Sequence, residues 1–90
     1  MTNKTELETK VNEMMRQIDW DYQFEDLDMS EEQWQDLIIL MGSILGNNSI
    51  SIREDVKNIR AHGQVTGSLL KFVEFAEHLT EPNITVHYTF

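Results

Sequence analysis

Eight carboxylates crowd one stretch of the sequence, residues 18–36, which contains no lysine or arginine. No basic residue occurs anywhere between Arg16 and Arg53. The formal net charge of the chain is −9 at pH 7, so this stretch accounts for nearly all of it. Carboxylates in such number can bind a metal ion, act as acids and bases, or attract a basic partner. The eight residues are Asp19, Asp21, Glu25, Asp26, Asp28, Glu31, Glu32 and Asp36.

Calcium binding is the first chemistry to test against the spacing of these acids. A calcium-binding EF-hand loop requires glycine at its sixth position and a bidentate glutamate at its twelfth. Counting from Asp19 places Phe24 and Ser30 at those positions. The acidic stretch therefore does not predict a calcium loop.

The last third of the chain offers no better site for chemistry. His62, His78 and His87 lack the paired spacing of a metal site. Residues 63–68 precede a helical pattern, but they lack the lysine and the spacing of a phosphate-binding loop. Acid–base catalysis needs carboxylates in unlike environments within a pocket that excludes water, and a row of outward-facing acids provides neither. We therefore expect no metal, no cofactor and no enzymatic activity.

A helix followed by a strand is expected to position the first acids. Apolar residues recur at helical spacing over residues 3–17 and reach Ile18. From Ile18 to Phe24 apolar and polar residues alternate, which is typical of a half-buried strand with its carboxylates facing outward. We favour a strand over residues 18–25, and a helix that continues through this segment is the alternative.

The clearest local signal begins a second helix directly after the strand. Ser30 and Gln33 have the spacing of a capping box, and Met29 is placed to pack on Trp34 as a hydrophobic staple. The apolar stripe that follows extends to Gly46, which is typical of a helix end. We expect this helix to be the most buried one.

Two further helices and a final strand are predicted after Gly46. A capping box at Ser51 predicts a short helix ending at Gly63, with a brief strand over 49–53 as the alternative. A fourth helix is expected from Thr66 to His78, and alternation over 84–90 predicts a terminal strand. The expected fold is α+β, a single domain over 1–90 with about four helices and a small antiparallel sheet of two or three strands.

The composition of the chain indicates whether it folds, whether it associates and where it is expected to act. With 40% hydrophobic residues, the chain has enough apolar side chains to form a core. A sheet of two strands is marginal and leaves an apolar edge, so pairing in a homodimer is expected to cover it. The sequence has no cysteine and no apolar run long enough to cross a bilayer, so we expect a cytoplasmic protein without membrane association.

The acidic stretch itself suggests the function. Outward-facing residues on a strand lie about 6.6 to 7 Å apart, close to the spacing of phosphates along a nucleic-acid strand. Such a surface can occupy the cleft of a basic nucleic-acid-binding protein, whereas direct contact with nucleic acid is opposed by like charge. We expect all eight acids to contact this partner as substitutes for phosphates.

In size, charge and lack of a catalytic motif, the chain resembles small acidic inhibitors of nucleic-acid-binding proteins. Phage anti-restriction DNA mimics and acidic immunity-type nuclease inhibitors are examples. The resemblance implies an inhibitor of a restriction nuclease or a nucleoid protein, acting in the host cytoplasm if it is encoded by a phage. The alternative is a structural or assembly adaptor whose apolar interface lies near Tyr88 and Phe90 and whose acids only keep it soluble.

Overall fold

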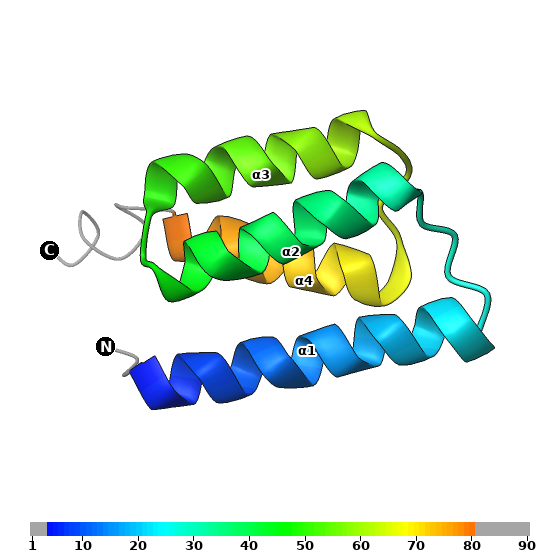
Figure 1. Cartoon of the computed structure of the whole chain (residues 1–90), viewed down its shortest axis with the longest axis horizontal. Coiled ribbons are helices and arrows are strands. Elements are labelled where there is room, and N and C mark those ends of the chain that lie inside the picture. The colour runs from blue at the N-terminus through cyan, green and yellow to red at the C-terminus, as the bar shows by residue number, and fades with distance from the viewer. Residues whose placement is uncertain (1–3, 81–90) are drawn as a thin grey trace, which may run out of the picture.

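The computed structural model describes residues 4–80, which form four α-helices, each antiparallel to the next along the chain (Figure 1). Each helix packs against two others, so that α1 contacts α2 and α4, and α3 also contacts both. This arrangement is an up-and-down four-helix bundle. The helices are α1 (Lys4–Phe24), α2 (Glu31–Leu45), α3 (Ser49–Ala61) and α4 (Gly67–Thr80).

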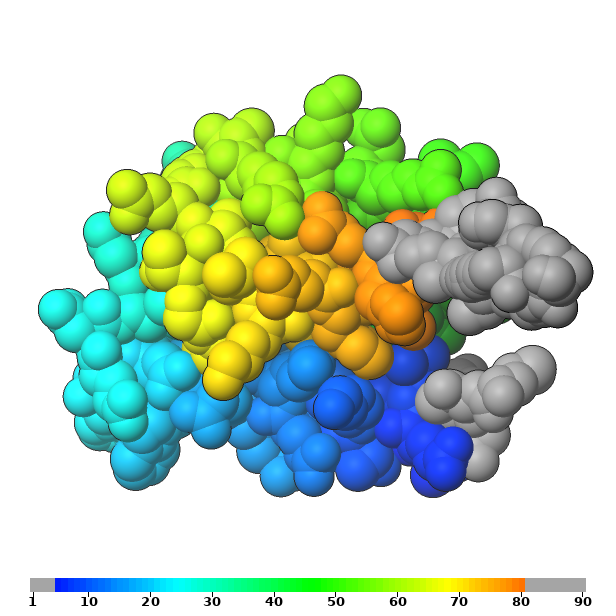
Figure 2. Space-filling model, turned by 180° about the vertical axis from the view of Figure 1, so that it is seen from behind, coloured from blue at the N-terminus to red at the C-terminus, as the bar shows by residue number. Residues whose placement is uncertain are grey.

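The core lies where the apolar stripes of the four helices meet, as the helical spacing of apolar residues requires. The α2–α3 contact is the most extensive, and α4 lies between α3 and α1 when the bundle is seen from behind (Figure 2). Buried apolar side chains of all four helices form one continuous hydrophobic cluster, which also includes Met29 of the α1–α2 loop. The buried helical residues of this cluster are Val11, Ile18, Leu37, Leu40, Ile44, Ile52, Val56, Ile59, Leu69, Phe72, Val73 and Ala76.

The α+β prediction is wrong, because residues 4–80 contain no strand. Residues 18–24 of the strand expected over 18–25 form the last turns of α1, and the alternative strand over 49–53 is the start of α3. A strand needs a neighbouring strand to pair its backbone groups, whereas a helix pairs them within itself. No such neighbour exists among the described residues, and the predicted strand over 84–90 lies outside them.

Two side-chain hydrogen bonds support the helical form of residues 17–23. Gln17 donates to Asp21 and Gln23 donates to Asp19, each over four residues and at 2.8 Å. Residues four apart are neighbours on a helix, whereas on a strand they share a face but lie about 13 Å apart. Ile18 is buried seven residues after Val11, so the helical stripe of residues 3–17 continues without a break.

The α1–α2 loop begins where α1 stops. Asp26 has a left-handed backbone (φ 66°), a conformation that aspartate tolerates better than most residues. Leu27 N–H then donates at 3.0 Å to the Asp21 carbonyl, which also accepts from the Glu25 N–H at 3.0 Å. The chain turns here toward the start of α2.

The starts and ends of the other helices follow local signals. The capping box of Ser30 and Gln33 is confirmed, and so is Gly46 as the C-cap of α2. The predicted capping box at Ser51 is wrong, because Asn48 is the N-cap of α3 and accepts from the Ser51 N–H. Both residues are good caps, and the chain uses the earlier one.

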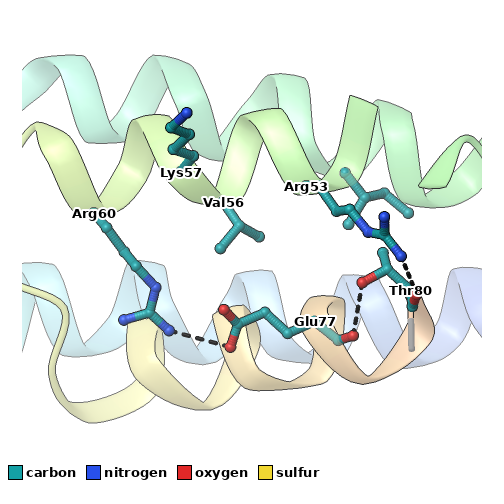
Figure 3. A pocket seen from close by; sticks show the side chains of 7 residues that line it. Arg53, Val56, Lys57, Arg60, Glu77 and Thr80 are labelled. Atoms are coloured by element: carbon teal, nitrogen blue, oxygen red, sulfur yellow. Dashed lines mark hydrogen bonds and ion pairs between the residues drawn. The ribbon is translucent and has the colours of Figure 1, made fainter. Parts of the chain in front are cut away.

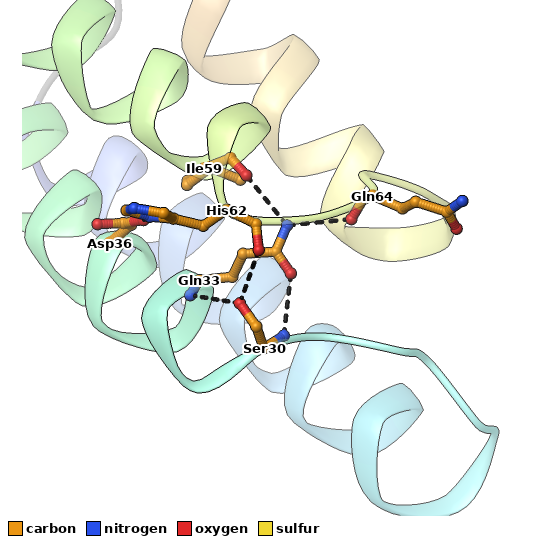
Figure 4. Close-up of polar contacts among 6 residues, drawn as sticks. All are labelled: Ser30, Gln33, Asp36, Ile59, His62 and Gln64. Carbon is orange, nitrogen blue, oxygen red and sulfur yellow. Dashed lines mark hydrogen bonds and ion pairs between the residues drawn. The ribbon is translucent and has the colours of Figure 1, made fainter.

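Gln33 links the start of α2 to the end of α3 (Figure 4). Its side-chain amide donates to the carbonyls of Ile59 (3.0 Å) and Gln64 (3.1 Å), while its Oε1 accepts from the Ser30 N–H (3.0 Å). Ser30 Oγ donates in turn to the His62 carbonyl at 3.1 Å. These bonds hold the α1–α2 loop against the α3–α4 turn and so place the acidic stretch at one end of the bundle.

Candidate protein-binding surface

Seven of the predicted contact acids gather at one end of the bundle. They come from the last turns of α1, the α1–α2 loop and the first turn of α2, the end that protrudes in cyan in Figure 2. All of them are exposed except Asp21, which is half-buried. We call this surface the acidic end, and it consists of Asp19, Asp21, Glu25, Asp26, Asp28, Glu31 and Glu32.

Asp36, the eighth predicted contact, lies elsewhere. It is buried on the side of α2 that faces α3, and its Oδ2 lies 2.6 Å from Nδ1 of His62 (Figure 4). Buried carboxylates are normally paired, and here the histidine is the partner. Asp36 therefore joins α2 to α3 and is not available to a second protein.

The acidic end is not the row of charges that a strand would present. Successive residues of a helix are rotated by about 100°, so Asp19 and Asp21 point about 200° apart around α1. The carboxylates therefore surround the tip of the bundle. The phosphate-like spacing of 6.6 to 7 Å fails together with the strand on which it depended.

Three exposed aromatic side chains, Trp20, Tyr22 and Phe24, lie within the acidic end, and two of them contact each other. Trp20 and Phe24 are 54% and 65% exposed, and their ring centroids are 4.7 Å apart. Trp20 Nε1 donates to a carboxylate oxygen of Glu25 at 3.3 Å. Tyr22 packs edge-on against Trp34 of α2, with ring centroids 5.3 Å apart. We call Trp20 and Phe24 the aromatic pair.

The strand expected over residues 18–25, with its carboxylates outward, would have turned both rings of the aromatic pair inward together with Ile18. On a helix, Trp20 lies about 200° from Ile18 and faces away from the bundle. The spacing of four residues between Trp20 and Phe24 was the signal that could have revealed a shared outer face. Whether this spacing places the two rings outside or inside depends on whether the segment is a helix or a strand.

The charge at the end of α1 is unfavourable for the helix. The carboxyl end of a helix carries a partial negative charge, which cations stabilise and carboxylates destabilise. The last turn of α1 holds no basic residue, and Asp21 lies within it. Glu31 and Glu32 occupy the first turn of α2, where the helix dipole favours acids. Asp21 at the end of α1 therefore opposes helix stability, whereas Glu31 and Glu32 at the start of α2 support it.

Neither a metal centre nor a membrane span was found in the described part of the chain. Within residues 4–80, no three side chains of the metal-binding types come together in a group that could hold an ion. Among the same residues, no helix has the length and apolar character needed to cross a membrane.

Comparison with known proteins gives no further assignment. No protein-family model matches the chain, and neither a curated protein nor a solved structure is significantly similar to it. The class that the geometry defines is a small four-helix domain with an acidic, aromatic-bearing end.

Proposed function

We propose that this protein binds a basic nucleic-acid-binding protein through its acidic end and blocks the partner's nucleic-acid site. The carboxylates would occupy the positions of phosphates without doing chemistry of their own. Their crowding attracts a cationic cleft and raises the rate of association. A restriction nuclease and a nucleoid protein are examples of partners with such a cleft.

The aromatic pair is the observation that carries this proposal. Solubility alone explains exposed acids, but it does not explain two large exposed rings among them. Aromatic residues are enriched at the centres of protein interfaces, and arginine side chains stack on their faces. A basic protein that presents arginine would meet both a ring and a carboxylate at this end.

The position of Asp21 supports the same proposal. A carboxylate in the last turn of α1 reduces helix stability, and no lysine or arginine of that turn offsets it. Surfaces that cost stability are typical of functional sites, where binding rather than folding is optimised. A surface needed only for solubility would gain more from acids placed at helix starts.

The first experiment is capture of partners from a bacterial lysate at low and high salt, followed by competition with duplex DNA. We expect a DNA-binding protein that is released by salt and by added DNA. Its affinity is then measured for the triple variant Asp19→Asn, Asp26→Asn, Asp28→Asn. We expect binding at low salt to weaken by about tenfold or more, because close charge pairs across an interface are lost.

A matched control carries the same change of net charge away from the acidic end. Glu13, Glu54 and Glu74 are exposed on α1, α3 and α4, and the variant Glu13→Gln, Glu54→Gln, Glu74→Gln also removes three carboxylates. We expect only a small loss of affinity for this control. Equal effects of the two triple variants, or no effect of either, would show that the acidic end is not the contact surface.

An adaptor that binds through apolar contacts is the second candidate. Ile38 and Ile39 of α2 are 55% and 56% exposed, so an apolar surface exists among the described residues. The interface first expected near Tyr88 and Phe90 lies outside the described residues 4–80. A partner that stays bound at high salt and is lost in the variant Ile38→Ser, Ile39→Ser would favour the adaptor over the nucleic-acid competitor.

A further inference from the structure

A second surface, opposite in charge to the acidic end, lies between α3 and α4. A depression of about 560 Å³ is formed there, within the range of pockets that hold small molecules. Its side chains come mainly from α3, with two from the end of α4 (Figure 3). We call it the α3–α4 groove, and it is lined by Ile52, Arg53, Val56, Lys57, Arg60, Glu77 and Thr80.

Two arginines cross the groove from α3 to α4. Arg53 Nη2 donates to the Thr80 carbonyl at 2.9 Å, and Arg60 Nη2 lies 3.1 Å from Oε1 of Glu77. Val56 lies between these two links and is buried (Figure 3). The arginines are seven residues apart, which corresponds to about 10 Å along the axis of α3. The groove is therefore an elongated slot with a guanidinium near each end.

The charge of the groove is unlike that of the chain as a whole. Its lining holds three cations and one carboxylate, although the net charge of the protein is −9. Three of the chain's seven lysines and arginines are thus gathered in one depression. Lys57 forms no hydrogen bond or ion pair with another described residue. Such a concentration of cations in a concave surface favours an anionic ligand.

We propose that the α3–α4 groove binds a small elongated polyanion, whose phosphate or carboxylate groups are held by Arg53 and Arg60. Each guanidinium has five N–H donors in a planar fork that matches phosphate and carboxylate oxygens. Each of these two uses one donor atom in its contact with α4, so further donors remain for a ligand. Glu77 competes with the ligand for Arg60.

The experiment uses the full chain with inorganic tripolyphosphate and citrate as probes, each titrated by calorimetry and by amide chemical shifts. Binding of either probe, with shifts confined to α3 and the end of α4, is the expected result. Arg60→Gln should weaken the affinity by about tenfold or more, because a charge-assisted contact is lost. Its exposed ion pair with Glu77 contributes little to stability, so this variant should fold.

A gain of affinity provides the sharpest test. Glu77→Gln removes the single carboxylate of the groove lining and releases Arg60, so polyanion binding should tighten several-fold. Glu74→Gln changes the net charge equally on the same helix but lies outside the lining, and it should leave the affinity nearly unchanged. Lys71→Gln is the corresponding control for Arg60→Gln.

Three outcomes would overturn the proposal. One is the absence of binding by either probe at millimolar concentration. Another is an equal change of affinity in the variants Glu77→Gln and Glu74→Gln, which would mean that binding depends only on the net charge of the protein. The third is binding of hexaglutamate but of neither small probe, which would assign the groove to an acidic protein segment. Tripolyphosphate and citrate together separate phosphate ligands from carboxylate ligands.

Discussion

A single polar side chain, Gln33, decides how the acidic end is held. It is 1% exposed, and its amide bonds to three backbone groups from the α1–α2 loop, from α3 and from the α3–α4 turn. Gly63 makes this possible, because a Cβ there would lie 2.8 Å from Gln33 Oε1. A glutamine is needed at this position because its side chain both donates and accepts hydrogen bonds.

Replacing Gln33 by leucine should lower the free energy of unfolding by about 2 to 4 kcal/mol, since several backbone groups lose their partner while the site stays buried. Urea denaturation measures the change. Gln35→Leu, an exposed position on the same helix, is the control and should change the free energy by less than about 0.5 kcal/mol. Equal stabilities of the two variants would show that the Gln33 contacts contribute little.

Among the helices, α1 has two roles that conflict, because it packs in the core and also carries part of the acidic end. Its first turns bury Val11 in the core, while its last turns carry the aromatic pair and the acids outward. The helix dipole disfavours those acids, as described above. The end of α1 is therefore where folding and partner binding should conflict.

The variant Asp21→Asn tests this conflict. The asparagine Oδ1 can still accept from Gln17, but the charge at the helix end is removed. We expect the free energy of unfolding to rise by about 0.3 to 1 kcal/mol, together with weaker binding of the partner. Glu13→Gln, in the middle of the same helix, should change neither quantity noticeably. Loss of stability in Asp21→Asn would contradict the dipole argument.

Two glycines of neighbouring elements should respond to alanine with opposite signs. Gly42 is exposed within α2, and a Cβ there would meet nothing within 4 Å. Gly42→Ala should therefore stabilise the protein by about 0.5 to 1 kcal/mol. Gly63→Ala should destabilise it, because the new methyl group meets the Gln33 amide. Thermal unfolding of the two variants provides the comparison, and a shift of the same sign in both would refute it.

At the scale of the whole molecule, the charges are separated. The acidic end lies where α1 meets α2, and the Arg53–Thr80 end of the α3–α4 groove lies at the opposite end of the bundle (Figure 1). Arg60, at the other end of the groove, lies only two residues before His62, whose carbonyl accepts from Ser30 at the start of α2. Homodimer formation stays a prediction, and its argument from a strand edge finds no support in residues 4–80.

Clustered like charges should make the stability of the protein depend on salt. We expect the melting temperature to rise by several degrees between about 10 and 300 mM NaCl, because screening reduces repulsion among the acids. The variant Asp19→Asn, Asp26→Asn, Asp28→Asn should show a smaller rise. A melting temperature that falls with salt would mean that favourable ion pairs outweigh the repulsion.

Features whose signals lie within a few residues of each other could be predicted from the sequence. The Ser30–Gln33 capping box needs only residues three apart. Helix α2 ends at Gly46, directly before Asn47, which has a left-handed backbone (φ 55°). The fourth helix, expected over residues 66–78, is observed as Gly67–Thr80 because its apolar stripe has a consistent helical spacing. The concentration of acids was likewise evident, because charge does not depend on fold.

The conformation of residues 18–24 depends on how the helices pack together. Their alternation suits a strand, but a strand requires a partner strand that no local signal supplies. Packing against the rest of the bundle favoured the helix instead, and this turned Trp20 and Phe24 outward. The burial of Asp36 beside His62 and the meeting of Arg60 with Glu77 are also contacts between distant residues. Such contacts depend on how the helices pack, which spacing along the chain does not encode.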